Sequence, residues 1–421
     1  MTKAAAESKK ARRTSLWVSS TYFTEGLPYM IVRFISTVFF TDLGVREALL
    51  GFINFLGIPW NLKFIWAPFL DIFGTKRGWM IRIQAAITAT VFIIACLAGF
   101  AQSGTDGHML RAVGFLFIAL AFISATNDIA IDAYYMEGLT DKQGQAAYSG
   151  LRIMAYRLAV IYSRTVIVAI AGFINWFWGF TAGSLTMGAF FVGHAFLLPR
   201  FEAERTGDGR HWREKLREFG ESFISYLKQD RIAVVLAFIV TYKLGDELLF
   251  AMNTPFLMRE LGVTKPQIAW LGGLVGAISA IAGAMLGSWW IKKVGLRRAI
   301  WPITLLMNVN IWAYVFLAWF KPSAATHEGI MLIAAVHGYE NIAAGLGNIA
   351  LMIYLMRLCM AKYKAGHFAI GSAIMSVGAN VIGGFSGVIV ENIGYTNLFI
   401  LSFFAALPSM ILLFFTPMHE E

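Results

Sequence analysis

Two aspartates stand four residues apart in a stretch that is otherwise suited to lipid. They are Asp128 and Asp132 in SATNDIAIDAYYMEG (124–138), at the end of an apolar run that begins near residue 109. On a helix this spacing places both carboxylates on one face. Ionisable side chains inside a membrane usually pair or line a water-filled path, so both acids are candidates for ion pairing and proton transfer. Ion pairs that only pack helices or close a gate are the alternative.

The following apolar segment carries two arginines, Arg152 and Arg157. A short loop joins the two segments, so they run antiparallel, and residues whose numbers have similar sums lie at similar depth. This places Asp128 level with Arg157, and Asp132 level with Arg152. The arginines are five residues apart, roughly 140° away from sharing one helix face, so at most one pair meets squarely. We predict Asp128–Arg157 as the deep ion pair.

Four more charges lie deep in the first part of the chain. Glu25 in YFTEGLPYM and Lys63 in PWNLKFIWAP lie at matching depths, whereas Arg33 and Arg164 lie deeper and find no acid at their level there. Guanidinium groups grip phosphate and carboxylate in a forked geometry, so we expect the two arginines to bind an anionic substrate. The alternative is that they extend toward the membrane surface. All four residues are candidates for substrate binding.

The second part of the chain carries the opposite charge within its apolar segments. TYKLGDELLF contains Lys243, Asp246 and Glu247, and HGYENIAAGLGN contains His337 and Glu340. The in-span charge is −2 here and +2 in the first part. This split suits an anion that moves together with protons, and histidine titrates near neutrality. A packing role for His337 is the alternative, and no third ligand that would make a metal site is evident.

Composition shows which elements must hold these residues. The chain has 421 residues, 58% of them hydrophobic and only 14% charged, with a mean hydropathy of +0.63. A soluble protein would carry roughly a quarter charged residues. Helices are the default for membrane spans, because lipid cannot satisfy free backbone groups. We predict an all-α integral membrane protein with twelve spans, at about 15–41, 47–70, 79–101, 109–135, 147–173, 175–198, 231–258, 266–291, 299–320, 328–357, 366–390 and 395–417.

Basic residues predict the orientation of these spans. Of the 35 lysines and arginines, 24 lie on the side of the N-terminal tail, five on the opposite side and six within spans. Cytoplasmic loops carry the excess of such residues, so both termini are expected in the cytoplasm. The net charge of +10 then reflects topology and contact with the lipid bilayer, and we expect no nucleic-acid partner. The apolar run after the tail is too long for a cleavable signal peptide.

An internal repeat predicts the domain organisation. A hydrophilic insertion at 199–230 separates residues 1–198 from 231–421, and we interpret it as a cytoplasmic linker. TDLGVREALLGF (41–52) aligns with RELGVTKPQIAW (259–270) at an offset of 218, and two later matches have offsets of 220 and 221. Two six-helix halves related in this way indicate the major facilitator fold. The loop APFLDIFGTKRG (67–78) loosely fits that superfamily's signature, which makes Asp71, Lys76 and Arg77 a predicted cytoplasmic gate loop.

Longer motifs resemble one family. ATNDIAIDA with AYRLA (155–159), YKLGDE (242–247), YENIAAGLGNIALMIYLM (339–356) and PWNLKFIWAPFLD (59–71) are similar to the AmpG-type muropeptide permeases of the major facilitator superfamily, which are related to acetyl-CoA transporters. The resemblance implies import of anhydro-muropeptides across the bacterial inner membrane, driven by protons. It also implies a functional set, carried over onto Asp128, Asp132, Arg157, Lys243, Asp246 and Glu340.

We therefore expect a multi-pass inner-membrane proton symporter for an anionic solute such as an anhydro-muropeptide, without a cofactor or a metal. A siderophore or acyl-CoA transporter of the same fold is an alternative. An integral-membrane acyltransferase that uses His337 is an alternative of a different class, and a lipid-handling protein is a third. The internal repeat favours transport, because alternating access uses two related halves and catalysis does not need them.

Overall fold

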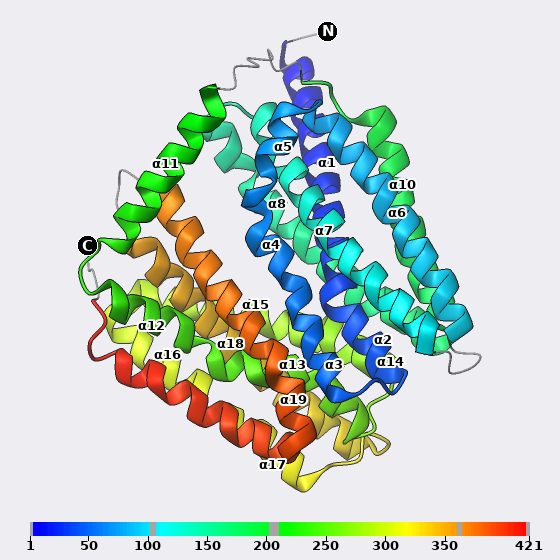
Figure 1. Ribbon diagram of the computed structural model, residues 1–421, viewed down its shortest axis with the longest axis vertical. Helices are drawn as coiled ribbons and strands as arrows, with labels where there is room; N and C mark the ends of the chain where they lie inside the picture. The colour runs from blue at the N-terminus through cyan, green and yellow to red at the C-terminus, as the bar shows by residue number, and fades with distance from the viewer. Residues whose placement is uncertain (1–2, 102–106, 202–209, 360–363, 418–421) are drawn as a thin grey trace. The chain divides into compact units, whose positions relative to one another are not determined.

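The computed structural model describes residues 3–101, 107–201, 210–359 and 364–417, and these residues contain helices but no strand (Figure 1). The helices up to residue 201 are α1 (Lys3–Met30), the π-helical turn η1 (Ile31–Ile35), α2 (Ser36–Asp42), α3 (Glu47–Phe52), the 3-10 turn η2 (Ile53–Gly57), α4 (Ile58–Leu62), the 3-10 turn η3 (Lys63–Ile65), α5 (Ala67–Ile72), α6 (Lys76–Ala101), α7 (Gly107–Gly138), α8 (Lys142–Tyr162), the π-helical turn η4 (Ser163–Ile167), α9 (Val168–Phe173) and α10 (Trp176–Leu197).

The helices after residue 209 are of the same kind, with long apolar helices and a short irregular turn. They are α11 (Arg210–Leu227), α12 (Ile232–Tyr242), α13 (Leu244–Arg259), α14 (Lys265–Trp270), the π-helical turn η5 (Leu271–Val275), α15 (Gly276–Val294), α16 (Leu296–Val309), α17 (Ile311–Phe320), α18 (His327–Arg357) and α19 (Lys364–Leu412). Helical segments therefore cover each of the twelve ranges that the sequence predicts as spans.

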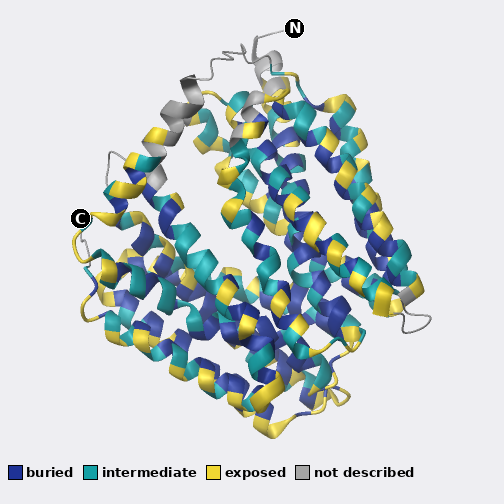
Figure 2. Ribbon diagram, in the orientation of Figure 1, coloured by how far each residue is buried: buried dark blue, intermediate teal, exposed yellow. Residues whose placement is uncertain are grey.

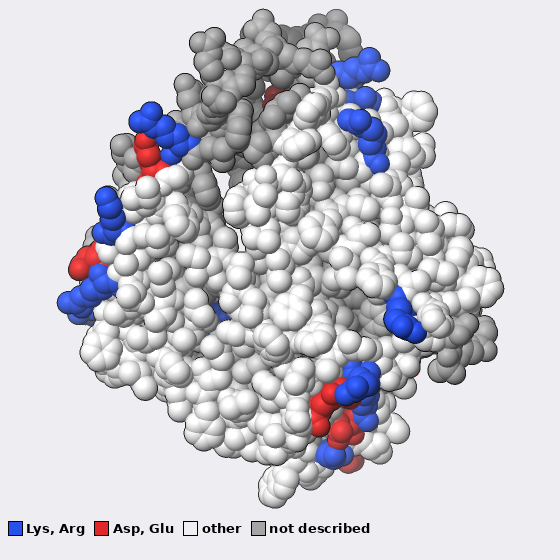
Figure 3. Space-filling model, viewed as in Figure 1, with Lys and Arg blue, Asp and Glu red and all other residues white. Residues whose placement is uncertain are grey.

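Nine helical stretches within the described ranges are long and apolar enough to cross a membrane. The difference from twelve has local causes. The last two predicted spans are joined in α19 across Gly394, whose φ of 79° breaks the helix. The seventh is interrupted at Lys243, where α12 ends and α13 begins. The first contains the charged residues Glu25 and Arg33, which lower its hydropathy. In Figure 3 most of the visible surface is uncharged, as a lipid-facing protein requires.

Contacts divide the chain into two compact units. The first unit contains Met1–Phe39 and Leu62–Gly207, and the second contains Phe40–Asn61 and Asp208–Glu421. The 40–61 stretch thus packs with the second unit, although it precedes the predicted boundary. Its ion pairs explain this: Glu47 Oε1 lies 2.5 Å from Arg259 NH1, and Asp42 Oδ2 lies 2.8 Å from Lys265 Nζ. The division into two six-helix halves around a 199–230 linker stays a prediction.

Each unit has its own apolar core. In the first unit, Phe39 packs edge-on against Trp176 and Phe180 with ring centroids 5.2 and 5.4 Å apart. In the second, Phe238 of α12 packs against Tyr354 of α18 within a larger cluster from α12, α16 and α18. Figure 2 shows buried and exposed positions alternating along most helices, because one face of each helix packs against neighbours. These cores fix the helix faces that carry the charged residues.

The repeat is visible in the irregular turns as well. The 3-10 turn η2 at 53–57 and the π-helical turn η5 at 271–275 are separated by 218 residues, the same offset as the matching sequences that precede them. A regular helix is therefore interrupted at the equivalent place in both copies. Such local departures from α-helical winding often accompany functional sites.

Candidate functional site

The first unit contains a cluster of charged side chains, which we call the first charged cluster: Glu25, Lys63, Asp128, Asp132 and Arg152. Lys63 Nζ forms an ion pair with Asp128 Oδ2 and lies 3.9 Å from Asp132 Oδ2. Arg152 NH2 lies 3.1 Å from Asp132 Oδ1, and the Tyr22 hydroxyl donates to the same oxygen over 2.8 Å. Asp132 thus bonds to a guanidinium and a hydroxyl, while Asp128 pairs with an ammonium.

Four elements position this cluster. The i, i+4 spacing on α7 puts both aspartates on one face, and α1 supplies Tyr22 and Glu25. The 3-10 turn η3 presents Lys63. Arg152 of α8 lies over two tyrosine rings, 4.3 Å from the Tyr22 centroid and 4.7 Å from that of Tyr135. Cation–π contacts with both rings restrict the guanidinium to a narrow range of positions.

Glu25 completes the cluster as its third acid. Its carboxylate interacts electrostatically with Asp128, Asp132 and Lys63. Among the described residues its buried Oε2 has no hydrogen-bond partner. Fully ionised, the cluster would hold three negative and two positive charges, an excess that is costly in an apolar medium.

The predicted Asp128–Arg157 pair is wrong. Asp128 pairs with Lys63, and Arg157 is exposed. The pair at the second matching depth, Asp132 with Arg152, is the one that forms. The reason is rotation: only one of two arginines five residues apart can face α7, and depth counting does not say which one.

The two deep arginines of the first unit lie on irregular turns. Arg33 is the third residue of η1 and Arg164 is the second residue of η4, and these two π-helical turns pack against each other. Both side chains are half-buried, and the Arg164 guanidinium lies 4.6 Å from the centroid of the Phe34 ring. A π-helical turn widens the helix and changes the direction of its side chains, which makes it a common feature of binding sites.

The second unit contains the second charged cluster: Lys243, Asp246, Glu247 and Glu340. Lys243 Nζ lies 3.4 Å from Asp246 Oδ2 and 3.2 Å from Glu247 Oε1, and its own side chain is 13% exposed. Glu340 on α18 is 1% exposed and interacts electrostatically with Asp246 and Lys243. Three acids thus surround one ammonium.

His337 belongs to the polar surroundings of this cluster. The Tyr314 hydroxyl lies 2.9 Å from His337 Nδ1, and Asn341 Nδ2 donates to Glu340 Oε2 over 3.1 Å and to the His337 carbonyl over 2.8 Å. In the described ranges of the chain no group of three His, Cys, Asp or Glu side chains could hold a metal ion. The arrangement offers hydrogen-bonding and titratable groups.

The predicted gate loop is held by backbone carbonyls. Lys76 Nζ donates to the Leu70 carbonyl over 2.8 Å. The Arg77 guanidinium donates to the Ala195 and Leu198 carbonyls at the end of α10, over 2.5 and 3.2 Å. The last carbonyls of a helix lack intrahelical partners, so a guanidinium there caps the helix. The Asp71 side chain lies outside the described residues.

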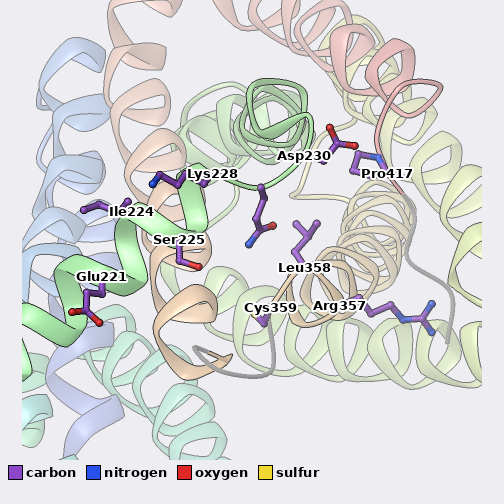
Figure 4. Close-up of a pocket in the computed structure, with 10 residues that line it drawn as sticks. Glu221, Ile224, Ser225, Lys228, Asp230, Arg357, Leu358, Cys359 and Pro417 are labelled. Atoms are coloured by element: carbon purple, nitrogen blue, oxygen red, sulfur yellow. The ribbon is translucent and has the colours of Figure 1, made fainter.

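A cavity of about 810 Å³ in the second unit lies at neither cluster (Figure 4). Ser225 of α11 and Lys228 just after it line the cavity, together with Arg357 and Leu358 at the end of α18. Beside it, burial raises the pKa of the Tyr226 hydroxyl to about 12, so this group stays neutral at physiological pH. None of the residues predicted to function lines this cavity, and it does not bear on their chemistry.

Sequence reasoning missed the contribution of Tyr22, which bonds to Asp132 and supports Arg152. A tyrosine in an apolar helix is not by itself a functional signal. The position of Tyr22, three residues before Glu25 and so on nearly the same face of α1, could have suggested the contact.

A family model and several known proteins match this sequence. A model of the Major Facilitator Superfamily matches residues 242–421. An uncharacterized protein of Haemophilus influenzae is 28% identical, over 97% of this chain and 96% of its own. The anhydromuropeptide permease of Escherichia coli K12 is 25% identical, over 93% of this chain and 77% of that protein. The putative transporter AmpG 4 of Rickettsia felis is also 25% identical, over 93% of each chain.

Solved structures agree on the fold. A D-xylose–proton symporter superposes with a TM-score of 0.70 at 11% identity, over 97% of this chain and 98% of that one. A POT family transporter in complex with 5-aminolevulinic acid superposes with a TM-score of 0.68 at 14% identity, over 96% of both. The chain therefore has the fold of major facilitator transporters and is similar, over most of its length, to membrane transporters of the AmpG type.

Proposed function

We propose that this protein imports an anionic solute, such as an anhydro-muropeptide, together with protons across the bacterial inner membrane. The relatives named above support the solute class, since one is an anhydromuropeptide permease. A siderophore or an acyl-CoA compound is the alternative cargo. The excess of basic residues on one side of the predicted spans supports cytoplasmic termini. Reporter fusions at the C-terminus test this orientation, and a periplasmic C-terminus contradicts it.

The observation that carries proton coupling is the excess of carboxylates in both charged clusters. The first has three acids and two cations, and the second has three acids and one cation. Buried charge without compensation is costly, and a proton on a carboxyl group removes the excess. Protons that bind and leave such groups link the clusters to the proton gradient.

The arginines support an anionic cargo. Arg33 and Arg164 lie on adjoining π-helical turns, and guanidinium groups bind carboxylate and phosphate in two parallel hydrogen bonds. Substrates of this fold bind near the middle of the membrane. We assign Arg33 and Arg164 to the anionic group, and the acids of the second charged cluster to the coupling proton.

The test is uptake into liposomes that contain the purified protein. A labelled anhydro-muropeptide is added outside, with an acidic exterior and a neutral interior. We expect accumulation above the external concentration, abolished by a protonophore and absent from protein-free liposomes. A siderophore and an acyl-CoA are added as competitors. If no labelled anhydro-muropeptide accumulates, a labelled siderophore and a labelled acyl-CoA are tested in the same way, and accumulation of either one identifies the alternative cargo. Accumulation that ignores the protonophore refutes proton coupling.

A further inference from the structure

Four buried polar side chains in the first unit form a network, which we call the Gln84 network. His194 Nδ1 donates to Gln84 Oε1 over 2.7 Å, and Gln84 Nε2 donates to Thr24 Oγ1 over 3.1 Å. Asn127 Nδ2 donates to the Thr24 carbonyl over 3.0 Å. The residues come from α10, α6, α1 and α7 and are almost completely excluded from solvent. The network thus ties four helices together in the apolar interior of the unit.

The network ends directly beside the first charged cluster. Thr24 precedes Glu25 on α1, and Asn127 precedes Asp128 on α7. Adjacent residues of a helix share a peptide unit. A hydrogen bond that fixes Thr24 against Asn127 therefore also fixes the positions from which the Glu25 and Asp128 side chains project. Apolar packing alone tolerates small shifts between helices, whereas a hydrogen bond in an apolar interior has one favourable geometry.

We propose that Thr24, Gln84, Asn127 and His194 are positioning residues that hold Glu25 against Asp128. The inference rests on the proposed function, which links the protonation of both charged clusters to the proton gradient. The network sets the rotation and depth of α1 relative to α7, and this geometry determines how strongly the carboxyls interact. His194 and Gln84 act through Thr24 and do not touch the cluster themselves.

The composition of the network argues against a role in stability alone. Among the described residues, neither His194 Nε2 nor Asn127 Oδ1 has a hydrogen-bond partner, although both atoms are buried. Each unsatisfied atom lowers the free energy of unfolding, and apolar side chains of similar volume would avoid this penalty. We therefore infer that these polar groups fix the relative positions of the helices, at some cost in stability.

The titration of these carboxyls depends on all the groups that face them. Glu25 and Asp128 are surrounded by charged and titratable side chains from α1, η3, α7 and α8, namely Tyr22, Lys63, Asp132, Arg152 and Tyr156. None of these side chains is altered by a change at Thr24 or Gln84. A shift in the titration after such a change therefore reports altered geometry within an unchanged set of charges.

The test is an infrared titration of the purified full-length protein, which follows the carbonyl band of protonated carboxyl groups as a function of pH. The Glu25→Gln and Asp128→Asn variants identify the bands of the cluster. Thr24→Val removes the hydroxyl that accepts from Gln84, and Thr24→Ser restores it. Thr21→Val is the matched control, because the Thr21 hydroxyl is equally buried on the same helix and donates only to carbonyls of that helix.

We expect Thr24→Val to displace the midpoint of the cluster bands by about half a pH unit or more, and Thr24→Ser and Thr21→Val to leave it in place. If Thr24→Val does not fold, Gln84→Met replaces it, since this change breaks the same hydrogen bond and leaves α1 intact. An unchanged midpoint overturns the proposal. Loss of folded protein in both variants also overturns it, because the network would then hold the fold and not the carboxyls.

The liposome assay separates this inference from the proposed function. If Glu25→Gln and Asp128→Asn still accumulate substrate against a gradient, the coupling role of the cluster fails. A displaced infrared midpoint in Thr24→Val still supports the positioning role in that case. If the two acid variants lose accumulation but Thr24→Val titrates as wild type, the positioning inference fails and the proposed function stands.

Discussion

The two charged clusters start from equivalent positions of the repeat and carry opposite charges there. Glu25 and Lys243 are 218 residues apart, the offset that also relates η2 to η5. Around Glu25 stand two more acids and two cations, whereas Lys243 is surrounded by three acids. The two copies of the repeat share one helix interruption, at η2 and η5, and differ in the charges that they hold.

The clusters also differ in how they are assembled. Lys243, Asp246 and Glu247 lie within one helical turn at the start of α13, and only Glu340 comes from elsewhere. The first cluster draws on α1, η3, α7 and α8. Its Lys63 side chain is 32% exposed, against 13% for Lys243. The second cluster therefore combines the larger excess of acid with the deeper burial, and this is why we assign it the coupling proton.

The largest expected effect concerns the acids of the second charged cluster. Glu340→Gln, Asp246→Asn and Glu247→Gln each remove one candidate proton carrier. A gradient of one pH unit supports about tenfold accumulation with one proton, and we expect the coupling variant to lose it completely. Exchange of internal for external substrate should persist, because it needs no net proton movement. Liposome uptake and counterflow measure the two activities.

The control for that experiment is Glu221→Gln, which removes an exposed acid on α11. If all three variants in the second cluster still accumulate substrate, the assignment of roles is reversed, and the carboxyls of the first cluster become the carriers.

The next effect is on stability and tests the pairing in the first cluster. Asp128→Ala leaves Lys63 with only the more distant Asp132 carboxylate, and breaking such a partly buried pair lowers the free energy of unfolding by about 3 kcal/mol. The double change Lys63→Met with Asp128→Ala should recover part of the loss. Denaturant unfolding in detergent measures both, with the exposed Arg217–Glu221 pair as a control without measurable effect. Purely additive losses would mean that the two side chains do not interact.

A smaller effect is expected on substrate affinity. Arg33→Gln or Arg164→Gln removes a charged donor from the proposed anion site, and we expect affinity to fall about tenfold, or roughly 1.4 kcal/mol. The loss should appear equally in accumulation and in exchange, unlike the loss expected for the coupling acids. Arg111→Gln is the matched control, because its guanidinium is exposed and bonds to its own helix. Normal affinity in both variants would place the anion site elsewhere.

The smallest expected effect tests the contribution of the Tyr22 hydroxyl separately from that of its ring. Tyr22→Phe removes the hydrogen bond to Asp132 and keeps the ring under Arg152, so we expect a loss of about 1 kcal/mol of unfolding free energy. Tyr135→Phe is the matched control, since that ring also carries Arg152 but its hydroxyl bonds to the Gln145 carbonyl. Equal losses of stability in thermal unfolding would show that the hydrogen bond to Asp132 stabilises the protein no more than the bond of Tyr135 to a backbone carbonyl.

Sequence patterns predicted the elements well and the contacts between them less well. Every predicted span is covered by helix, because hydropathy and backbone satisfaction are properties of a single segment. The depth count placed Asp132 level with Arg152, and these two side chains do form an ion pair. The ion pair of Asp128 with Lys63 was not predicted. The Gln84 network gave no signal at all, since glutamine, threonine and histidine on separate helices show no shared pattern.

The sequence by itself determined which segments are helical, that the chain contains a repeat, and which charges lie deep. These properties depend on composition along one helix and on the regular rise of its residues. Tertiary structure decided which deep charges meet and that residues 40–61 pack with the second unit. It also decided that Arg33 and Arg164 lie on π-helical turns. Rotation and tilt of a helix follow from packing against its neighbours, and the rotation decides which ion-pair partner a charged side chain meets.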